Sequence, residues 1–301
     1  MTERVRIGTR RSPLALLQTD EVVRRLVRRF PEMRFRPVPI VTSGDRETAA
    51  GGSPDFTDAI DLALARGEID LAVHSAKDVE SILPSGLRLA AFVRRADPRD
   101  CLVVRRGVAP GRLPKGARVG SSSVRRRAQL LRRRPDLVVE EVRGNVGTRL
   151  GLVRDGSVDA IVLAVAGLAR LHRTRSIGRV LPTREYLPAP GQGALVVAVR
   201  EGDGPSERVA AALDHPATRA AVLAERSFSA ELGGDCRSPL AALGTVRGAR
   251  LSLVGEVLAP DGRRSVRASR RGPTSNAEAI GRSLGRAVLS AGGDEILAQT
   301  R

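Results

Sequence analysis

Residues 117–165, ARVGSSSVRRRAQLLRRRPDLVVEEVRGNVGTRLGLVRDGSVDAIVLAV, alternate short apolar runs with amphipathic stretches. The runs at 117–120, 137–142 and 159–165 have the length of strands, and 124–134 and 146–154 have the length and spacing of helices. Three serines, 121 to 123, directly precede the first helix, where a hydroxyl can cap free backbone N–H groups. This order predicts a mostly parallel sheet with helices on both faces.

The same alternation continues toward the N-terminus. Ser12 is a predicted N-cap, with Pro13 at the first helical position. The other elements expected there are strands at 5–8, 37–42 and 69–73 and a helix at 56–66.

The pattern changes after about residue 215. We expect helices at 218–231 and 276–289 and strands at 251–258 and 265–269. Pro260-Asp261-Gly262 joins the two strands as a hairpin signal. This region therefore predicts a small α+β domain after two α/β domains.

Length and composition limit the class of protein. The chain has 301 residues, which suggests two or three domains, and 42% of them are apolar, as in soluble globular proteins. Its longest clear apolar run, 160–169, is about half of the ~20 residues that a membrane helix needs. The N-terminus has no apolar signal region, and two cysteines make no disulfide framework. We expect a cytoplasmic protein, with nothing to indicate an obligate assembly, so a monomer.

The charge is strongly positive. Lys and Arg number 51 and Asp and Glu 33, a net charge of +18. Only Lys77 and Lys115 are lysines, so a single surface arginine carries little weight, whereas Lys77 stands out. The charge fits a polyanionic small substrate, a nucleic acid or a solvated basic face. Tyr186 is the only tyrosine and no nucleic-acid-binding motif is visible, so we expect no nucleic-acid partner.

Polar clusters follow several predicted strands. In open α/β sheets, ligands bind beyond the carboxyl ends of the strands, and a helix N-terminus there attracts anions. The clusters are 9–12, 121–126 and 143–149, and each combines hydroxyls or free N–H groups with arginines. Any one of these clusters alone is explained by helix capping and solvated charge. Three clusters at equivalent positions favour a cleft that binds carboxylates or phosphates. Asp78, in the segment 74–78, could stabilise a developing cation and shuttle a proton there, or be an N-cap.

Cys236 lies in the polar, glycine-containing stretch 232–239, and Cys101 is far away in sequence. No CxxC pair or Cys/His ligand set surrounds it, which argues against a zinc or iron–sulfur site. An isolated thiol in such a loop has two interpretations. It could be a nucleophile or a covalent attachment point, or it could be a small buried apolar side chain.

Taken together, these motifs resemble the porphobilinogen deaminase (hydroxymethylbilane synthase) family over almost the whole chain. Eight segments match in the family's order: 9–16, 74–78, 97–100, 120–126, 143–149, 163–168, 190–194 and the Cys236 loop. The resemblance implies two periplasmic-binding-protein-like (type II) α/β domains with mostly parallel sheets and a small C-terminal α+β domain carrying the cysteine. The domains would span residues 1–93 plus 194–211, 98–187 and 216–301.

The resemblance also implies the activity. Such an enzyme is a transferase that condenses four porphobilinogen molecules head to tail, releases ammonia and hydrolyses the product to hydroxymethylbilane for tetrapyrrole and haem biosynthesis. A dipyrromethane cofactor would be held through a thioether to Cys236. Asp78 would be catalytic, with no metal. The residues implied to hold the cofactor are Lys77, Asp100, Ser123, Arg125, Arg126 and Gly144, and those implied to hold substrate are Arg10, Ser12, Phe56, Ser121, Arg143, Arg149, Arg170 and Gln192.

The chain departs from the family pattern in the loop after residue 45. Ser53 and Asp58 stand where many members have lysines, and Asp55 adds a negative charge. Glu80 stands where a proline usually follows Asp78-Val79. We hypothesise weaker carboxylate binding or altered closure of that loop. The alternative interpretation is a non-catalytic anion-binding protein or an inactive paralogue with the same cleft.

Overall fold

The computed structural model describes residues 4–42, 57–80, 82–109, 111, 113–234 and 238–299. The chain divides into two compact units. Unit 1 consists of Met1–Ala96 and Ala194–Arg219, and unit 2 of Asp97–Gly193 and Ala220–Arg301. Each unit has its own sheets and core, so the two are described in turn.

Unit 1 contains a five-stranded sheet of order β2-β1-β3-β10-β4. Strands β1, β2 and β3 are parallel, while β10 is antiparallel to both of its neighbours, so four strands run one way and one is reversed. The elements are β1 (Arg4–Arg10), α1 (Pro13–Arg29), β2 (Arg34–Ile40), α3 (Asp58–Ala65), β3 (Leu71–Ser75), the 3-10 turn η1 (Ala76–Asp78), β4 (Leu87–Phe92), β10 (Leu195–Arg200) and α7 (Gly204–Ala211).

Helices cover both faces of this sheet. Val22 and Leu26 of α1 pack with Leu71 and Val73 of β3 on one face. On the other face, the apolar side of α3 packs against Ala72 of the same strand. Successive side chains of a strand point to opposite faces of the sheet, so alternate residues of β3 pack against α1 and against α3.

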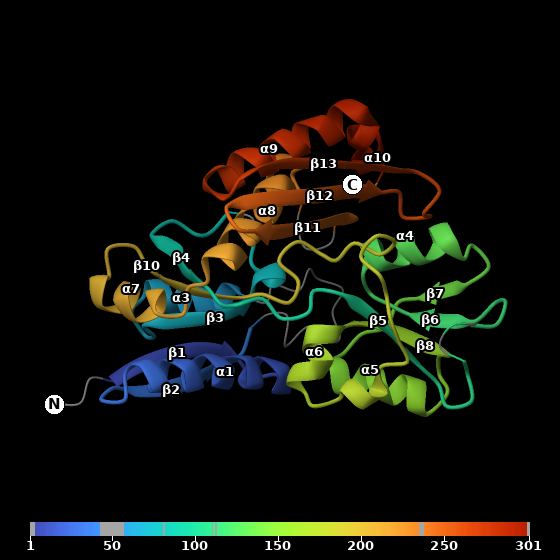
Figure 1. Cartoon of the computed structure of the whole chain (residues 1–301). Helices are drawn as coiled ribbons and strands as arrows, with labels where there is room; N and C mark the ends of the chain where they lie inside the picture. The colour runs from blue at the N-terminus through green and yellow to red at the C-terminus, as the bar shows by residue number, and fades with distance from the viewer. Residues whose placement is uncertain are drawn as a thin grey trace. The chain divides into compact units, whose positions relative to one another are not determined.

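Unit 2 begins with a second five-stranded sheet of order β7-β6-β8-β5-β9. Here β5 is the reversed strand, antiparallel to β8 and β9. Helix α4 packs on one face and α5 and α6 on the other (Figure 1). The elements are β5 (Asp100–Val104), β6 (Arg118–Gly120), α4 (Val124–Arg133), β7 (Val138–Glu140), α5 (Val146–Arg154), β8 (Ala160–Ala164), α6 (Val165–Arg170), the 3-10 turn η2 (Thr174–Ser176) and β9 (Arg179–Val180).

The C-terminal part of the chain has a core of its own. Its antiparallel sheet, β11-β12-β13, packs against α8 and α9 through residues such as Phe228, Leu253 and Leu284 (Figure 1). The elements are α8 (Pro216–Glu231), β11 (Leu240–Arg247), β12 (Arg250–Leu258), β13 (Ser265–Pro273), the 3-10 turn η3 (Thr274–Asn276), α9 (Ala277–Val288), the π-helical turn η4 (Leu289–Gly293) and α10 (Asp294–Ala298).

This architecture confirms the predicted α/β class, with two mostly parallel sheets covered by helices and a small C-terminal α+β part. The predicted hairpin is also confirmed, since β12 pairs with β13 and Gly262 has a positive φ of 76°. The limits predicted for the three domains stay a prediction, because unit 2 contains both the second α/β sheet and the C-terminal sheet.

Some elements differ from the sequence expectation. The strand expected at 37–42 lies at Arg34–Ile40, and the helix expected from residue 56 begins at Asp58 among the described residues. The strand expected at 159–165 lies at Ala160–Ala164, and α6 begins at Val165. The pattern did not predict β4, β5, β9, β11, α7 or α10. Within the described ranges, no helix is long and apolar enough to cross a bilayer.

Candidate functional site

The segment that carries Asp78 is held tightly at the carboxyl end of β3. Lys77 and Asp78 are partly exposed and lie in the short turn η1. The N–H of Ala76 donates to the carbonyl of Ala194, at the start of β10, with an N···O distance of 3.0 Å. The turn is therefore fixed to the sheet, although its two charged side chains remain accessible.

The end of β3 is also held from both faces. On one face, Gln18 of α1 donates from Nε2 to Oγ of Ser75 at 2.9 Å. On the other, Nε2 of His74 lies 3.1 Å from Oδ1 of Asp61 in α3, and both side chains are buried. Neither Gln18 nor Asp61 belongs to a motif that would predict these contacts. His74 is thus a buried structural partner of Asp61.

Arg10 and Ser12 lie at the same edge of the unit 1 sheet as Asp78. Arg10 ends β1, and β1 and β3 are parallel neighbours, so their carboxyl ends meet at that edge. Ser12 caps α1 as predicted: its Oγ accepts from the N–H of Ala15 at 3.3 Å, and Pro13 follows at the first helical position. The edge therefore combines a helix N-terminus with two basic residues and one carboxylate.

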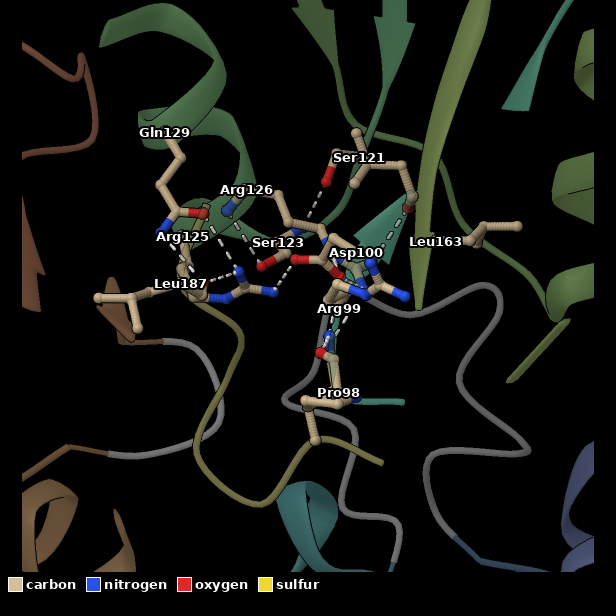
Figure 2. A network of polar contacts seen from close by, with 12 residues as sticks. Pro98, Arg99, Asp100, Ser121, Ser123, Arg125, Arg126, Gln129, Leu163 and Leu187 are labelled. Carbon is tan, nitrogen blue, oxygen red and sulfur yellow. Dashed lines mark hydrogen bonds and ion pairs between the residues drawn. The ribbon is translucent and has the colours of Figure 1, made fainter. Parts of the chain in front are cut away.

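In unit 2, Asp100 is the centre of a buried ion network (Figure 2). Its Oδ2 lies 2.8 Å from Nη2 of Arg125, and its Oδ1 lies 2.7 Å from Nη2 of Arg126. Nε2 of Gln192 donates to the same Oδ1 at 2.9 Å. The side chains of Asp100, Arg125 and Arg126 are 1%, 3% and 9% exposed. Four predicted site residues are therefore brought together by hydrogen bonds and ion pairs.

Burial and charge act in opposite directions on this network. Burial alone would raise the pKa of Asp100, but the charges of Arg125 and Arg126 and the hydrogen bonds from Arg126 and Gln192 outweigh it and hold that pKa well below its usual range. Burial lowers the pKa of Arg125, although the nearby Asp100 charge opposes that effect. Asp100 is thus ionised at neutral pH.

The network continues to the start of α4. Ser123 caps this helix, its Oγ accepting from the N–H of Arg126 at 3.4 Å, and the N–H of Ser123 donates to Oγ of Ser121 at 3.2 Å (Figure 2). Ser121 is buried. The first-turn N–H groups of a helix carry partial positive charge, so this end of α4 adds to the attraction for an anion.

Arg149 connects the loop after β7 with the loop after β6. It donates from Nη2 to Oγ of Ser122 at 3.0 Å and from Nε to the carbonyl of Gly144 at 2.9 Å. Burial, followed by the charge of Arg126, lowers the pKa of Arg149. Gly144 has a φ of 95° and its Cα faces Thr148 closely, so a side chain there would be strained and would collide.

Two predicted arginines, Arg170 and Arg143, make contacts outside the network around Asp100. Arg170, at the end of α6, donates from Nη2 to the carbonyl of Gly193 at 3.3 Å. Arg143 is exposed and lies 3.1 Å from the carboxylate of Glu141. The structure thus joins Arg170 to residues 187–193, the crossover segment that precedes β10, but shows Arg143 in a surface ion pair.

The unit 2 cluster has an excess of positive charge. Arg125, Arg126 and Arg149 contribute three charges, and Asp100 is the carboxylate paired within it, which leaves a local surplus of two. Like charges this close to one another repel, and an anion would relieve the repulsion. The residues therefore fit a ligand with several carboxylates. No group of three or more His, Cys, Asp or Glu within the described ranges could hold a metal ion.

Two predicted site residues, Cys236 and Phe56, lie outside the described residues, as do Ser53 and Asp55. The described parts that flank the cysteine are α8, which ends at Glu231, and β11, which starts at Leu240. Asp58 is described and lies in the first turn of α3. A carboxylate there favours the helix through its dipole, which gives Asp58 a structural role.

Comparisons with known proteins identify the family. A family model described as "Porphobilinogen deaminase, dipyromethane cofactor binding domain" matches residues 5–208, and one described as "Porphobilinogen deaminase, C-terminal domain" matches residues 219–290. Among solved structures, the periplasmic VFT2 domain of Bordetella pertussis BvgS is similar over 70% of this chain and 86% of that chain, with 18% identity and a TM-score of 0.43.

Curated relatives match over nearly their full length. The porphobilinogen deaminase of Thermus thermophilus is 48% identical over 98% of this chain and 98% of that protein. Those of Roseiflexus castenholzii and Acidithiobacillus ferrooxidans are 45% and 44% identical, over 99% and 100% of this chain and 100% and 99% of those proteins. The chain belongs to the porphobilinogen deaminase family.

Proposed function

We propose that this chain is a hydroxymethylbilane synthase, a transferase that joins four porphobilinogen molecules head to tail with loss of four ammonia molecules and then releases linear hydroxymethylbilane by hydrolysis. The family match over residues 5–208 and 219–290 supports this activity. The observation that carries it in the structure is the buried Asp100–Arg125–Arg126 network, because a pyrrole substrate bearing acetate and propionate groups needs fixed positive charge.

The cofactor of this family is dipyrromethane, and the charge surplus beside Asp100 fits its carboxylates. We place its attachment on the sulfur of Cys236, as a thioether. When bound, it supplies the primer to which substrate units are added. Lys77, Ser123, Arg125, Arg126 and Gly144 would hold its carboxylates, while Asp100 pairs with the two buried guanidinium groups and orients them.

Asp78 is the proposed catalytic residue. Its carboxylate is held by the fixed turn η1 and is partly exposed, so it can reach a bound pyrrole. There it would stabilise the positive charge that develops on the substrate as ammonia leaves, and would accept or return a proton at its carboxylate oxygen. Its role needs no metal ion.

The remaining predicted residues would bind the carboxylates of incoming substrate. Arginine suits this role, because its planar guanidinium group can donate two parallel hydrogen bonds to one carboxylate. The carboxylate-binding set comprises Arg10, Ser12, Ser121, Arg143, Arg149, Arg170 and Gln192, while Phe56, whose ring has no hydrogen-bond donor, would contact the pyrrole ring of the substrate instead. We also propose that the protein is cytoplasmic and works as a monomer. Sedimentation at several protein concentrations would test the monomeric state.

Intact mass spectrometry tests the function directly. The wild-type protein is compared with Cys236→Ser, and Cys101→Ser is the matched control for loss of a thiol. We expect the wild type and Cys101→Ser to carry an excess mass of two porphobilinogen units less two ammonias, and Cys236→Ser to lack it. A wild-type protein that stays unmodified after incubation with porphobilinogen would contradict the proposal and favour an anion-binding protein or an inactive paralogue.

A further inference from the structure

The crossover segment 187–193 is bonded along its length within unit 2. The carbonyl of Leu187 accepts from Nη1 of Arg125 at 2.5 Å and from Nε2 of Gln129 at 3.1 Å. The carbonyl of Pro188 accepts from the N–H of Ala242, in β11, at 3.0 Å. This segment thus touches the arginine network at one end and the C-terminal sheet beside it.

Gln192 ties the other end of the segment to the same network. Besides Asp100, its Nε2 donates to the carbonyl of Pro98 at 2.7 Å. Gln192 is buried, and its hydrogen bond to Asp100 is fully buried, while its bond to Pro98 is partly buried. A shift of this segment would therefore change the hydrogen bonding of Asp100 and, through it, the orientation of Arg125 and Arg126.

One buried carboxylate positions the middle of the segment. Glu225, in α8, is 0% exposed. Its Oε2 accepts from the N–H of Gly191 at 2.6 Å, and its Oε1 accepts from the N–H of Gly244, in β11, at 2.7 Å. A buried carboxylate is costly unless it is well satisfied, and charge-assisted bonds to N–H groups are short and strong. Glu225 thus links α8, β11 and the segment next to Gln192.

We infer that Glu225 is a positioning residue that couples the C-terminal domain, which leads to the Cys236 loop, to the carboxylate-binding network around Asp100. The inference rests on the proposed function. Glu225 acts through Gly191, whose N–H donates to it, and the neighbouring Gln192 bonds to Asp100. Glu225 would therefore set the fit of the network to bound carboxylates, without touching substrate itself.

Glu225→Gln tests the coupling. An amide has one acceptor oxygen, so its NH2 group would face one of the two N–H donors and that hydrogen bond would be lost. Glu231→Gln is the matched control: Glu231 lies in the same helix, where its carboxylate is 3.5 Å from Arg286 and bonds to no part of 187–193 in the described structure. Each variant is made with Cys236 and with Cys236→Ser, giving cofactor-loaded and cofactor-free proteins.

The measurements are the melting temperature of each pair and the steady-state kinetics of the loaded enzymes. We expect Glu225→Gln to shrink the melting-temperature difference between loaded and cofactor-free protein by about half, and to raise KM for porphobilinogen about tenfold with a smaller change in kcat. Glu231→Gln should leave both unchanged. Equal lowering of both melting temperatures with an unchanged KM would overturn the inference and leave Glu225 purely structural.

Two further measurements keep the outcomes distinct. If Glu225→Gln does not fold, Glu225→Asp takes its place, because it keeps the charge but shortens the side chain. We expect Glu225→Asp to show the same reduced melting-temperature difference between loaded and cofactor-free protein. A melting-temperature difference equal to that of the wild type would overturn the inference. In the double variant with Gln192→Ala, we expect the effects on KM to be non-additive, because both act on one network. Absence of the cofactor mass in the wild type would instead refute the proposed function.

Discussion

Arg126 donates two hydrogen bonds to a single oxygen of Asp100, from Nη2 at 2.7 Å and from Nε at 3.1 Å. Arg125 pairs with the other oxygen at 2.8 Å. Two adjacent residues in the first turn of α4 are thus oriented by one carboxylate at the start of the reversed strand β5. This relationship holds two guanidinium groups in the protein interior.

Removal of Asp100 should be strongly destabilising. Asp100→Ala leaves two buried guanidinium groups without their carboxylate, and breaking a buried ion pair costs about 3–5 kcal/mol. Urea unfolding at pH 7 measures this loss. The control is Asp97→Ala, because the Asp97–Arg99 pair is partly exposed and should contribute less than ~1 kcal/mol. Equal, small losses in both variants would contradict the role given to Asp100.

The same network predicts sensitivity to acid. The pKa of Asp100 is lower in the folded protein than in the unfolded chain, so its contribution to stability is complete above the unfolded value of about 4 and is lost as the pH falls toward the folded value. We expect the unfolding free energy of the wild type to drop more steeply below pH 4 than that of Asp100→Asn. Parallel curves for the two proteins would refute this assignment.

Cys101 should be chemically inert in the folded protein. Its thiol is fully buried, and burial raises its pKa to about 12, so almost no thiolate exists at pH 8. In Cys236→Ser, where Cys101 is the remaining thiol, iodoacetamide should label only after denaturation. Alkylation of the native protein within minutes would show that this part of the core opens readily.

The His74–Asp61 contact should stabilise unit 1. Asp61→Ala removes a buried carboxylate that lies 3.1 Å from His74, and a buried polar group left without its partner costs about 1–3 kcal/mol. Thermal or urea unfolding measures the loss. Leu62→Ala is a control in the same helix, since Leu62 is 50% exposed and its replacement should cost much less. A comparable loss in the two variants would argue against the contact.

Asp58 tests the departure from the family pattern. Asp58→Lys places a positive charge in the first turn of α3, which should cost about 0.3–1 kcal/mol through the helix dipole. If the family's lysine assists carboxylate binding, the variant should lower KM for porphobilinogen. Steady-state kinetics of Asp58→Asn provide the comparison, because this variant removes the negative charge without adding a positive one. Unchanged kinetics in Asp58→Lys would remove support for the hypothesis that the missing lysine weakens carboxylate binding.

Much of the fold could be predicted from local pattern. The helices α4 and α5 and the strands β6 and β8 lie within a residue or two of their predicted ranges, and Ser12 and Ser123 cap the helices that they precede. These features depend on residues close in sequence, through apolar spacing and through hydroxyls that bond to N–H groups three residues on. The family motifs likewise indicated which residues could form the site.

Tertiary structure alone decided how those residues are paired. Asp100 reaches Arg125 and Arg126 because β5 enters its sheet reversed, between β8 and β9, and Glu225 reaches Gly191 because α8 packs beside a segment more than 30 residues earlier. Neither contact leaves a periodic signal, since strand order and direction depend on long-range packing. Local sequence patterns thus indicated most of the helices, several of the strands and the positive charge of this protein. Which charged side chains are buried together depended on contacts between segments that are distant in sequence.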